Sequence, residues 1–217
     1  PVINSIKNGL VSNNIIGIHA ILNGTCNYIL SDMTNNSKSF KESLIEAKKL
    51  GFAEADPTFD IDGVDSAHIL VILGLLAYGA KPDIDKVYVE GITSITGEDI
   101  KYADRLGYKI KLLCIASLEK NTLDFRVHPA LCLSDSISAG IGGALNAIFL
   151  EGDYSKKITF IGEGAGAEPT ASSVVSDIIN AAKNNKFLNN FNKIKNTRTY
   201  KDIMDRKGKY FVRFIVK

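Results

Sequence analysis

Five carboxylates gather in one stretch of the chain with no basic side chain near them in sequence. The stretch FAEADPTFDIDGVDSAHIL covers residues 52–70 and contains Glu54, Asp56, Asp60, Asp62 and Asp65. No Lys or Arg occurs between Lys49 and Lys81. Like charges that are packed together disfavour each other's ionised form unless a cation joins them. The stretch is therefore either a pocket for a metal ion or an ammonium group, or a solvated acidic loop that caps a helix.

Familiar metal and nucleophile motifs do not fit this stretch. The spacing of Asp60, Asp62 and Asp65 differs from an EF-hand loop, which needs ligands at alternate positions and a closing Glu. The chain has no HExxH motif, its three histidines are scattered, and nucleophile-elbow and P-loop patterns are missing. We predict no metal ligands, although a Mg²⁺ site of Asp and Glu stays open as an alternative.

Two glycine-containing turns are further candidates for binding. Asn23-Gly24-Thr25 joins a predicted strand to a helix, with Thr25 as the expected N-cap, and a helix N-terminus can bind a carboxylate or carbonyl oxygen. Gly162 to Ala167 formally fits G-x-G-x-x-[GA], yet no second hydrophobic strand with a terminal acid follows as a dinucleotide fold requires. Acids beside a helix N-terminus suit a small molecule with a cationic and an oxyanionic end, such as an amino acid.

The elements that would position these residues change character along the chain. Helical periodicity and capping signals predict helices over 40–50, 63–78, 98–106 and 170–182, and β-type runs predict strands over 15–22, 87–90, 108–118, 123–133, 144–150 and 156–161. Short polar turns between the later strands favour antiparallel pairing. We expect an α+β fold, with a mixed, largely antiparallel sheet and helices packed on one face. The helix over 63–78 is apolar all round, which predicts complete burial.

Composition excludes several classes of protein. The 217 residues are 45% hydrophobic and 23% charged, with a net charge of +2, which is too small to indicate nucleic-acid binding. The longest apolar run, 69–80, is too short to span a bilayer, and no signal peptide opens the chain. Three distant cysteines without a CxxC pair indicate a reducing compartment, so we expect a cytoplasmic protein.

Three ordered motifs give the chain a specific resemblance. GIHAILNGTCNYIL at 17–30, AKKLGFAEADPTFDIDGVDSAHIL at 47–70 and GEGAGAEPTASSVVSDI at 162–178 resemble homoserine dehydrogenase over residues 1–177. The resemblance implies the substrate-binding and dimerisation part, over 1–182, of an oxidoreductase of threonine and methionine biosynthesis. Such enzymes reduce L-aspartate 4-semialdehyde to L-homoserine with NADPH or NADH. A Lys/Asn-rich linker over 183–206 and a first ACT-domain strand over 207–217 would follow, and the nucleotide-binding domain would lie upstream.

The resemblance also implies roles for individual residues. Glu54 and Asp65 match positions that bind the substrate ammonium group and serve the catalytic site, and Asp60 matches another acid lining it. Gly24 and Thr25 match the turn beside the substrate. Gly164 and Gly166 match the loop brought against the nicotinamide end of NAD or NADP. The family further implies a homodimer whose interface uses the strands within 108–150.

The chain departs from the family pattern at one critical position. The pattern DxxxKL places a proton-donating lysine one helical turn after Asp65, and here the residue is Ile69. General acid catalysis typically contributes about 10²–10⁴-fold in rate, and isoleucine cannot supply it. Phe52, Cys26 and Glu163 also replace the usual Tyr, Thr and Pro. We therefore expect a weakened enzyme whose isolated fragment is inactive. The rivals are a non-catalytic amino-acid-binding or oligomerisation module and a carboxylate-metal hydrolase.

Overall fold

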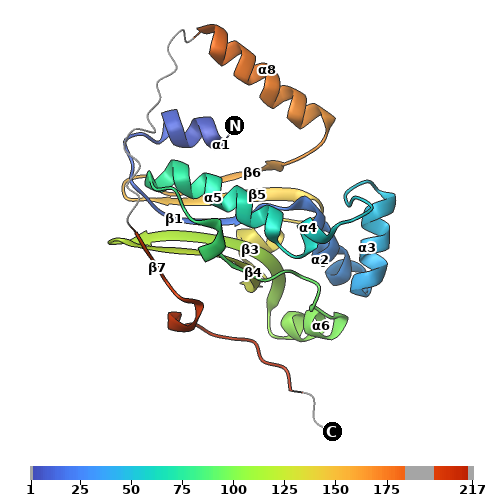
Figure 1. The fold of residues 1–217 in the computed structure, drawn as a ribbon. Helices are drawn as coiled ribbons and strands as arrows, with labels where there is room; N and C mark the ends of the chain where they lie inside the picture. Colours follow the sequence, from blue (N-terminus) through green and yellow to red (C-terminus); the bar gives the residue numbers. More distant parts are fainter. Residues whose placement is uncertain (1, 184–197, 215–217) are drawn as a thin grey trace.

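A seven-stranded sheet forms the centre of the computed structural model, which describes residues 2–183 and 198–214 (Figure 1). The path through the sheet is β2-β4-β3-β1-β5-β6, and β7 pairs with β4. The strands are β1 (Ile15–Ile21), β2 (Tyr88–Val89), β3 (Tyr108–Glu119), β4 (Thr122–Leu133), β5 (Leu145–Gly152), β6 (Lys156–Glu163) and β7 (Thr199–Tyr200).

Helical elements occupy the segments between these strands. They are α1 (Val2–Asn4), a π-helical turn over Ser5–Gly9, α2 (Gly24–Asn36), α3 (Phe40–Lys49), α4 (Thr58–Ile61), α5 (Val64–Tyr78), α6 (Gly97–Arg105), α7 (Ile137–Gly140) and α8 (Ala167–Lys183), with 3₁₀ turns at Ile84–Lys86 and Ile203–Asp205. A capping box at Ser39 begins α3: the Ser39 hydroxyl accepts from the Glu42 amide, and the Ser39 amide donates to the Glu42 carboxylate.

Most strands of the sheet pair antiparallel. β3 and β4 form a long hairpin from Tyr108↔Leu133 to Glu119↔Thr122, and β1 lies between β3 and β5. β5 continues to β6 antiparallel, whereas β2 and β7 each pair with β4 in parallel. The predicted α+β class with a mixed, mostly antiparallel sheet is confirmed.

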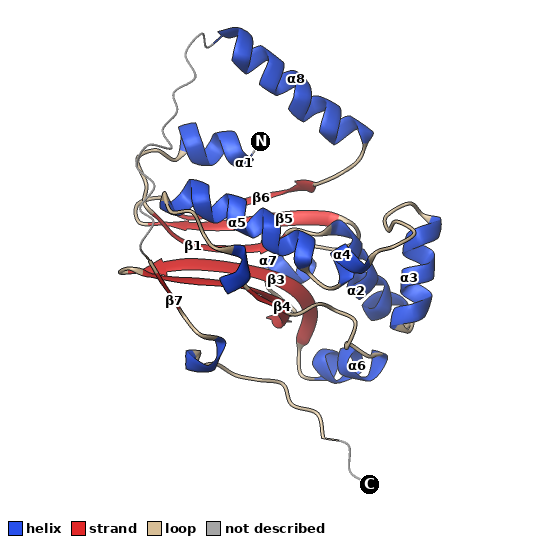
Figure 2. Ribbon diagram, in the orientation of Figure 1, coloured by secondary structure: helices blue, strands red, loops and turns tan. Residues whose placement is uncertain are grey.

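The main core lies between one face of the sheet and the helices (Figure 2). Ile18 and Ala20 from β1 are fully buried, and Leu70 from α5 packs in the same cluster. A smaller cluster of Ile21, Ile141 and Ala147 lies on the opposite face of the sheet. The first strand thus contributes side chains to both sides, and its end sits beside the turn that the sequence singled out.

Two packing predictions were wrong. The α5 helix is not buried all round, because it lies on one face of the sheet and leaves Ile72 50% exposed. In the strand predicted over 15–22, strict alternation would place Ile16 on the same face as buried Ile18, but Ile16 is 47% exposed because the β1–β5 register shifts between Ile15 and Gly17. An irregular register moves a side chain to the other face of a strand.

The last part of the chain packs differently from the sheet. The α8 helix stands away from the strands, and none of its residues is buried (Figure 1). Residues 207–214 have no regular secondary structure, so the strand predicted at 207–217 is not formed over its described part. Most of the predicted linker at 183–206 falls outside the described residues.

Candidate active site

Asn23 connects the two acids that the sequence placed in the candidate pocket. Its side-chain amide donates to Asp60 Oδ1 at 2.8 Å and to Asp65 Oδ2 at 3.0 Å. Its carbonyl oxygen accepts from the Cys26 amide at 2.8 Å, so Asn23, not Thr25, is the N-cap of α2. The predicted cap was wrong by two positions, although Asn before Gly was a usable signal because asparagine is as good a cap as serine.

Thr25 ties the same turn to the acidic stretch. Its hydroxyl donates to the Phe52 carbonyl at 2.5 Å and lies 3.5 Å from Asp60 Oδ2. The side chain is buried in the first turn of α2. Thr25 therefore holds residues 52–60 against the helix N-terminus, and the sequence-predicted residues Thr25, Asp60 and Asp65 lie in one hydrogen-bonded group.

The other acids of the stretch lie farther out. Asp56 caps the short helix α4, where its Oδ1 accepts from the Thr58 amide at 3.1 Å and from the Thr58 hydroxyl at 2.6 Å. Glu54 and Asp62 are exposed, whereas Asp60 and Asp65 are half-buried. The structure thus brings Asp60 and Asp65 together through Asn23 but does not join Glu54 to them by a hydrogen bond.

The buried thiol of Cys26 lies close to these acids. Cys26 is fully buried, and its Sγ donates to the Asp60 carbonyl at 3.2 Å. Burial first, and then the charges of Asp60, Cys114, Asp65 and Asp62, raise the pKa of Cys26 well above its ordinary value. The thiol therefore stays protonated and adds no negative charge to the site.

Ile69 lies one turn beyond Asp65 on α5, where the sequence resemblance expects a lysine. Its half-buried side chain packs against the main hydrophobic core. An aliphatic side chain there neither donates a proton nor neutralises the acids. Among the described residues, no Lys or Arg forms an ion pair with Asp60 or Asp65.

The segment 141–146 lies between the two glycine turns. A Cβ atom on Gly24 would stand 2.7 Å from the Ala144 carbonyl oxygen, so only glycine allows this approach. Asn146 donates from Nδ2 to the Leu22 carbonyl at 3.0 Å, and a Cβ atom on Gly164 would collide with the Asn146 amide. Gly166, with φ of +115°, ends the same loop before α8. The strand-turn-helix context of Gly164 and Gly166 is as predicted.

A buried lysine on β3 was missed at the sequence level. Lys111 is 3% exposed, and its ammonium group contacts Asn27 and Ser31 of α2 and the carbonyl of Ile141. Burial, opposed by Cys132 and reinforced by nearby Lys109, lowers the pKa of Lys111 to about 8. The sequence offered one signal for this burial, a lysine within the apolar run YKIKLLCIAS at 108–117. The alternation of side chains along a strand made Lys111 look like an ordinary solvent-facing residue.

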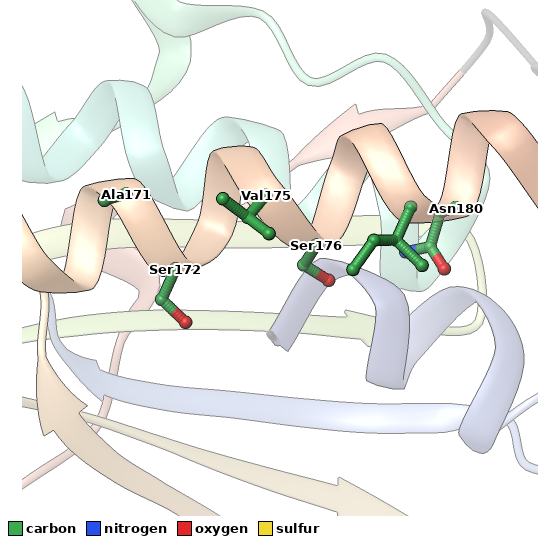
Figure 3. Close-up of a pocket in the computed structure, with 6 residues that line it drawn as sticks. Ala171, Ser172, Val175, Ser176 and Asn180 are labelled. Atoms are coloured by element: carbon green, nitrogen blue, oxygen red, sulfur yellow. The ribbon is translucent and has the colours of Figure 1, made fainter.

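A shallow groove of about 430 Å³ lies along α8, away from the acids. It is lined by Ala171, Ser172, Val175, Ser176, Ile179 and Asn180, and Figure 3 shows these side chains along one side of the helix. All lining residues come from α8 itself. The groove is therefore an exposed helix face and not part of the candidate site.

Other kinds of site receive no support within the described ranges. No group of three or more His, Cys, Asp or Glu residues there is arranged to hold a metal ion. No helix in residues 2–183 or 198–214 has the length and apolarity needed to cross a bilayer.

Comparison with known proteins identifies a single family. The family model for homoserine dehydrogenase matches residues 1–179. Homoserine dehydrogenase of Pseudomonas aeruginosa is 46% identical over 183 residues, which are 84% of this chain and 42% of that protein. The Helicobacter pylori enzyme is 44% identical over 188 residues, which are 87% of this chain and 45% of that protein. The chain thus spans less than half of the length of these curated relatives.

Solved structures agree with the sequence comparison. A homoserine dehydrogenase from Thiobacillus denitrificans superposes with a TM-score of 0.82 at 45% identity, covering 84% of this chain and 42% of that one. A hyperthermophilic archaeal homoserine dehydrogenase in complex with NADPH gives 0.71 at 30% identity, covering 84% and 52%.

Proposed function

The chain belongs to the homoserine dehydrogenase family, and on that premise we propose that it forms the substrate-binding part of an enzyme that interconverts L-aspartate 4-semialdehyde and L-homoserine, the oxidoreductase step leading to threonine and methionine. The observation that carries the proposal is the pair Asp60 and Asp65, held together by the Asn23 amide without a basic partner among the described residues. An amino acid supplies the missing cation in its ammonium group.

We assign the two ends of the substrate to two parts of the site. Asp60 and Asp65, with exposed Glu54 at the rim, bind the ammonium group. The turn at Gly24 and Thr25 faces the rest of the molecule, because its glycine permits close backbone approach and α2 presents its first amides there. This arrangement orients the carbon chain of the substrate relative to the loop at 162–166.

NADPH or NADH would supply the hydride for reduction of the aldehyde and become NADP⁺ or NAD⁺, and the carbonyl oxygen takes up one further proton to give the alcohol. The loop with Gly164 and Gly166 fits this cofactor end, because between β6 and α8 it has no side chain larger than the methyl group of Ala165 and its backbone can approach a flat ring closely. The groups that hold the rest of the cofactor lie outside the part of the family that this chain spans.

Ile69 limits what the residues of this chain can do for the proton. Because isoleucine replaces the lysine of the family pattern, no side chain one turn after Asp65 can protonate the developing alkoxide. We infer binding and orientation as the principal contribution of this chain. The same substitution favours the second candidate, a non-catalytic module that binds an amino acid without turning it over.

Ligand titration tests the proposed site directly. Calorimetry of the protein with L-homoserine is expected to show saturable binding that disappears in Asp60→Asn/Asp65→Asn, while Mg²⁺ alone gives no heat of binding. Saturable Mg²⁺ binding without homoserine binding would instead support the carboxylate-metal alternative.

Steady-state assay of the complete protein then separates the enzyme from the binding module. Homoserine-dependent reduction of NADP⁺ or NAD⁺ supports the enzyme, whereas homoserine binding with no reduction of either cofactor supports the module. The isolated chain is expected to bind homoserine and to show no turnover.

We further propose a cytoplasmic homodimer. All three cysteines are buried free thiols, which fits a reducing compartment. In the described ranges, the sheet face opposite α5 carries the small cluster around Ile21, against which half-buried Leu113 and Phe149 pack. Light scattering of the purified protein at micromolar concentration is expected to give twice the chain mass.

A further inference from the structure

Lys111 is a buried cation whose contacts are all uncharged. Its Nζ donates to Asn27 Oδ1 at 2.9 Å, to Ser31 Oγ at 3.3 Å and to the Ile141 carbonyl at 2.5 Å. Among the described residues, no carboxylate lies within ion-pair distance of it. A lysine ammonium has three N–H donors, and here three oxygens receive them. The pocket therefore fits the protonated form, even though burial of a charge without a counter-ion is unfavourable.

The oxygens around Lys111 belong to segments that reach the candidate site. Asn27 lies two residues after Thr25, and its Nδ2 donates to the carbonyls of Ile141 at 3.2 Å and Leu145 at 3.0 Å. Lys111 and Asn27 thus hold both ends of the segment 141–145 against the start of α2. The Ile141 carbonyl accepts from both side chains.

The segment that Lys111 holds contacts both glycine turns. The Ala144 carbonyl lies against Gly24, on the substrate side. Asn146 bonds to the Leu22 carbonyl and packs against Gly164, on the cofactor side. A displacement of 141–146 would therefore change the spacing between the Asn23–Thr25 turn and the glycine loop. A misplacement of about 1 Å between reacting groups can cost about 10²-fold in rate.

We propose that Lys111 is a positioning residue for the reaction: its ammonium group fixes the segment 141–146, and this segment sets the distance between the substrate turn and the cofactor loop. The proposal rests on the function proposed above for this site. Lys111 itself contacts neither the acids nor the glycine loop, so its effect on turnover is transmitted through Asn27 and the segment 141–146.

The protonation of Lys111 gives the proposal a pH signature. Burial lowers the pKa of Lys111 to about 8 from an ordinary value of 10.5, so a local opening that exposes Lys111 to solvent must bind a proton above pH 8 and costs more free energy as pH rises towards 10.5. The titratable groups that face it are Cys132 on β4 and Lys109 on its own strand. Burial raises the pKa of the Cys132 thiol, so this thiol stays neutral over the range in which Lys111 loses its proton.

Hydrogen exchange on the wild-type protein tests the structural half of the proposal. Between pH 7 and 9.5, after correction for intrinsic exchange, protection of amides in 141–146 is expected to rise at least threefold, because an opening that solvates Lys111 costs more free energy as pH rises, while the β3–β4 hairpin keeps its protection. In Lys111→Met the protection of 141–146 is expected to be low at every pH. The matched control is Lys109→Met, which removes a half-buried lysine from the same face of β3 and should keep the wild-type protection of 141–146 at pH 7. Equal, pH-independent protection in wild type and Lys111→Met would overturn the proposal.

Kinetics of the complete protein test the functional half. Lys111→Met is expected to lower kcat at least tenfold and to change the KM for homoserine less than threefold, because the acids that bind the ammonium group stay in place. Loss of protection with unchanged kcat would overturn the positioning role. If Lys111→Met does not fold, the pH dependence of hydrogen exchange in the wild-type protein alone tests whether Lys111 holds the segment 141–146. If wild type neither binds nor oxidises homoserine, the proposed function fails, and the exchange experiment still reports separately on Lys111.

Discussion

Two sites of opposite charge, each without a partner of the other sign among the described residues, flank the first turns of α2. On one side Asp60 and Asp65 share the Asn23 amide and have no basic partner in the described ranges. On the other side Lys111 is enclosed by Asn27, Ser31 and the Ile141 carbonyl. The acids are half-buried and open to a ligand, whereas Lys111 is 3% exposed and closed to one.

The difference in exposure indicates two different roles: the accessible acids can bind a ligand, whereas the enclosed lysine can only hold parts of the protein in place. A charge that is left accessible and unpaired can gain its partner from solution, so its cost is recovered when the ligand binds. A charge that is enclosed by neutral oxygens can stabilise only the segments that supply them. Both charges cost folding stability, and natural proteins tolerate such costs mainly at functional sites.

The largest expected effect comes from placing a cation among the acids. Ile69→Lys in the complete protein should raise kcat about 10²–10⁴-fold with little change in KM, because it supplies the proton donor that isoleucine cannot. The measurement is the initial rate of homoserine-dependent NADP⁺ or NAD⁺ reduction.

The matched control for that variant is Ile72→Lys, which adds the same charge to the exposed side of α5. It should leave kcat unchanged. Equal rates for Ile69→Lys and wild type would show that position 69 does not supply the proton in this protein.

The second effect concerns the enclosed charge and the pH dependence of stability. Burial lowers the pKa of Lys111 to about 8 from an ordinary value of 10.5, so above pH 8 the folded state binds fewer protons than the unfolded state. Its contribution therefore becomes more favourable as pH rises through that window, by about 3 kcal/mol at most. Below pH 8 Lys111 is protonated in both states, and burying its charge lowers the folding stability by the full amount.

Urea unfolding at several pH values between 7 and 10.5 measures this contribution. Subtracting the curve of Lys111→Met cancels the other titrating groups, and the difference should grow in favour of wild type as pH rises. A difference that stays flat would mean that Lys111 keeps its ordinary pKa despite its burial.

The sequence alone identified the acidic site but not the buried lysine, because the acids are close together in the chain whereas the groups that contact Lys111 are far from it. The acids stand within one stretch, and the absence of Lys and Arg from 50–80 is visible by inspection. Strand runs and the glycines at 63 and 79 likewise located β3, β4 and α5 to within a few residues. The partners of Lys111 lie 80 and 84 positions away on α2, and 30 positions away at Ile141.

The contacts of individual side chains could not be predicted either, because they too depend on residues that are distant in the sequence. Asn23 bonds to acids 37 and 42 positions away, so its role as their common donor depends on how α4 and α5 pack against α2. The exposure of Ile16 depends on an irregular register with β5, and that of Ile72 on the sheet covering only one side of α5. Local propensity predicts the elements, but only their packing decides which side chains meet.

A smaller effect is expected from neutralising one accessible acid. Asp65→Asn keeps the acceptor for Asn23 but removes the charge, and homoserine should bind about 10- to 150-fold more weakly, since a hydrogen bond to a charged group contributes about 1.5–3 kcal/mol. Calorimetric titration gives the Kd. The control Asp62→Asn removes the same charge from an exposed neighbour and should change the Kd less than threefold. Equal losses in both variants would indicate a diffuse field instead of a direct contact.

The smallest expected effect tests the amide that joins the acids. Asn23→Asp keeps a good cap for Cys26 but replaces the donor to Asp60 and Asp65 by a third carboxylate, so it should destabilise the fold by about 1–3 kcal/mol at pH 7. Crowding raises the pKa of the carboxyl group in the folded state, which then binds more protons than the unfolded state. The loss should therefore shrink as pH falls towards about 5. Asn23→Ser is the neutral control, since it keeps a capping oxygen and a donor, and its difference from wild type should not vary with pH. Parallel pH curves for the two variants, measured by urea unfolding, would show that the acids are already neutral or already apart.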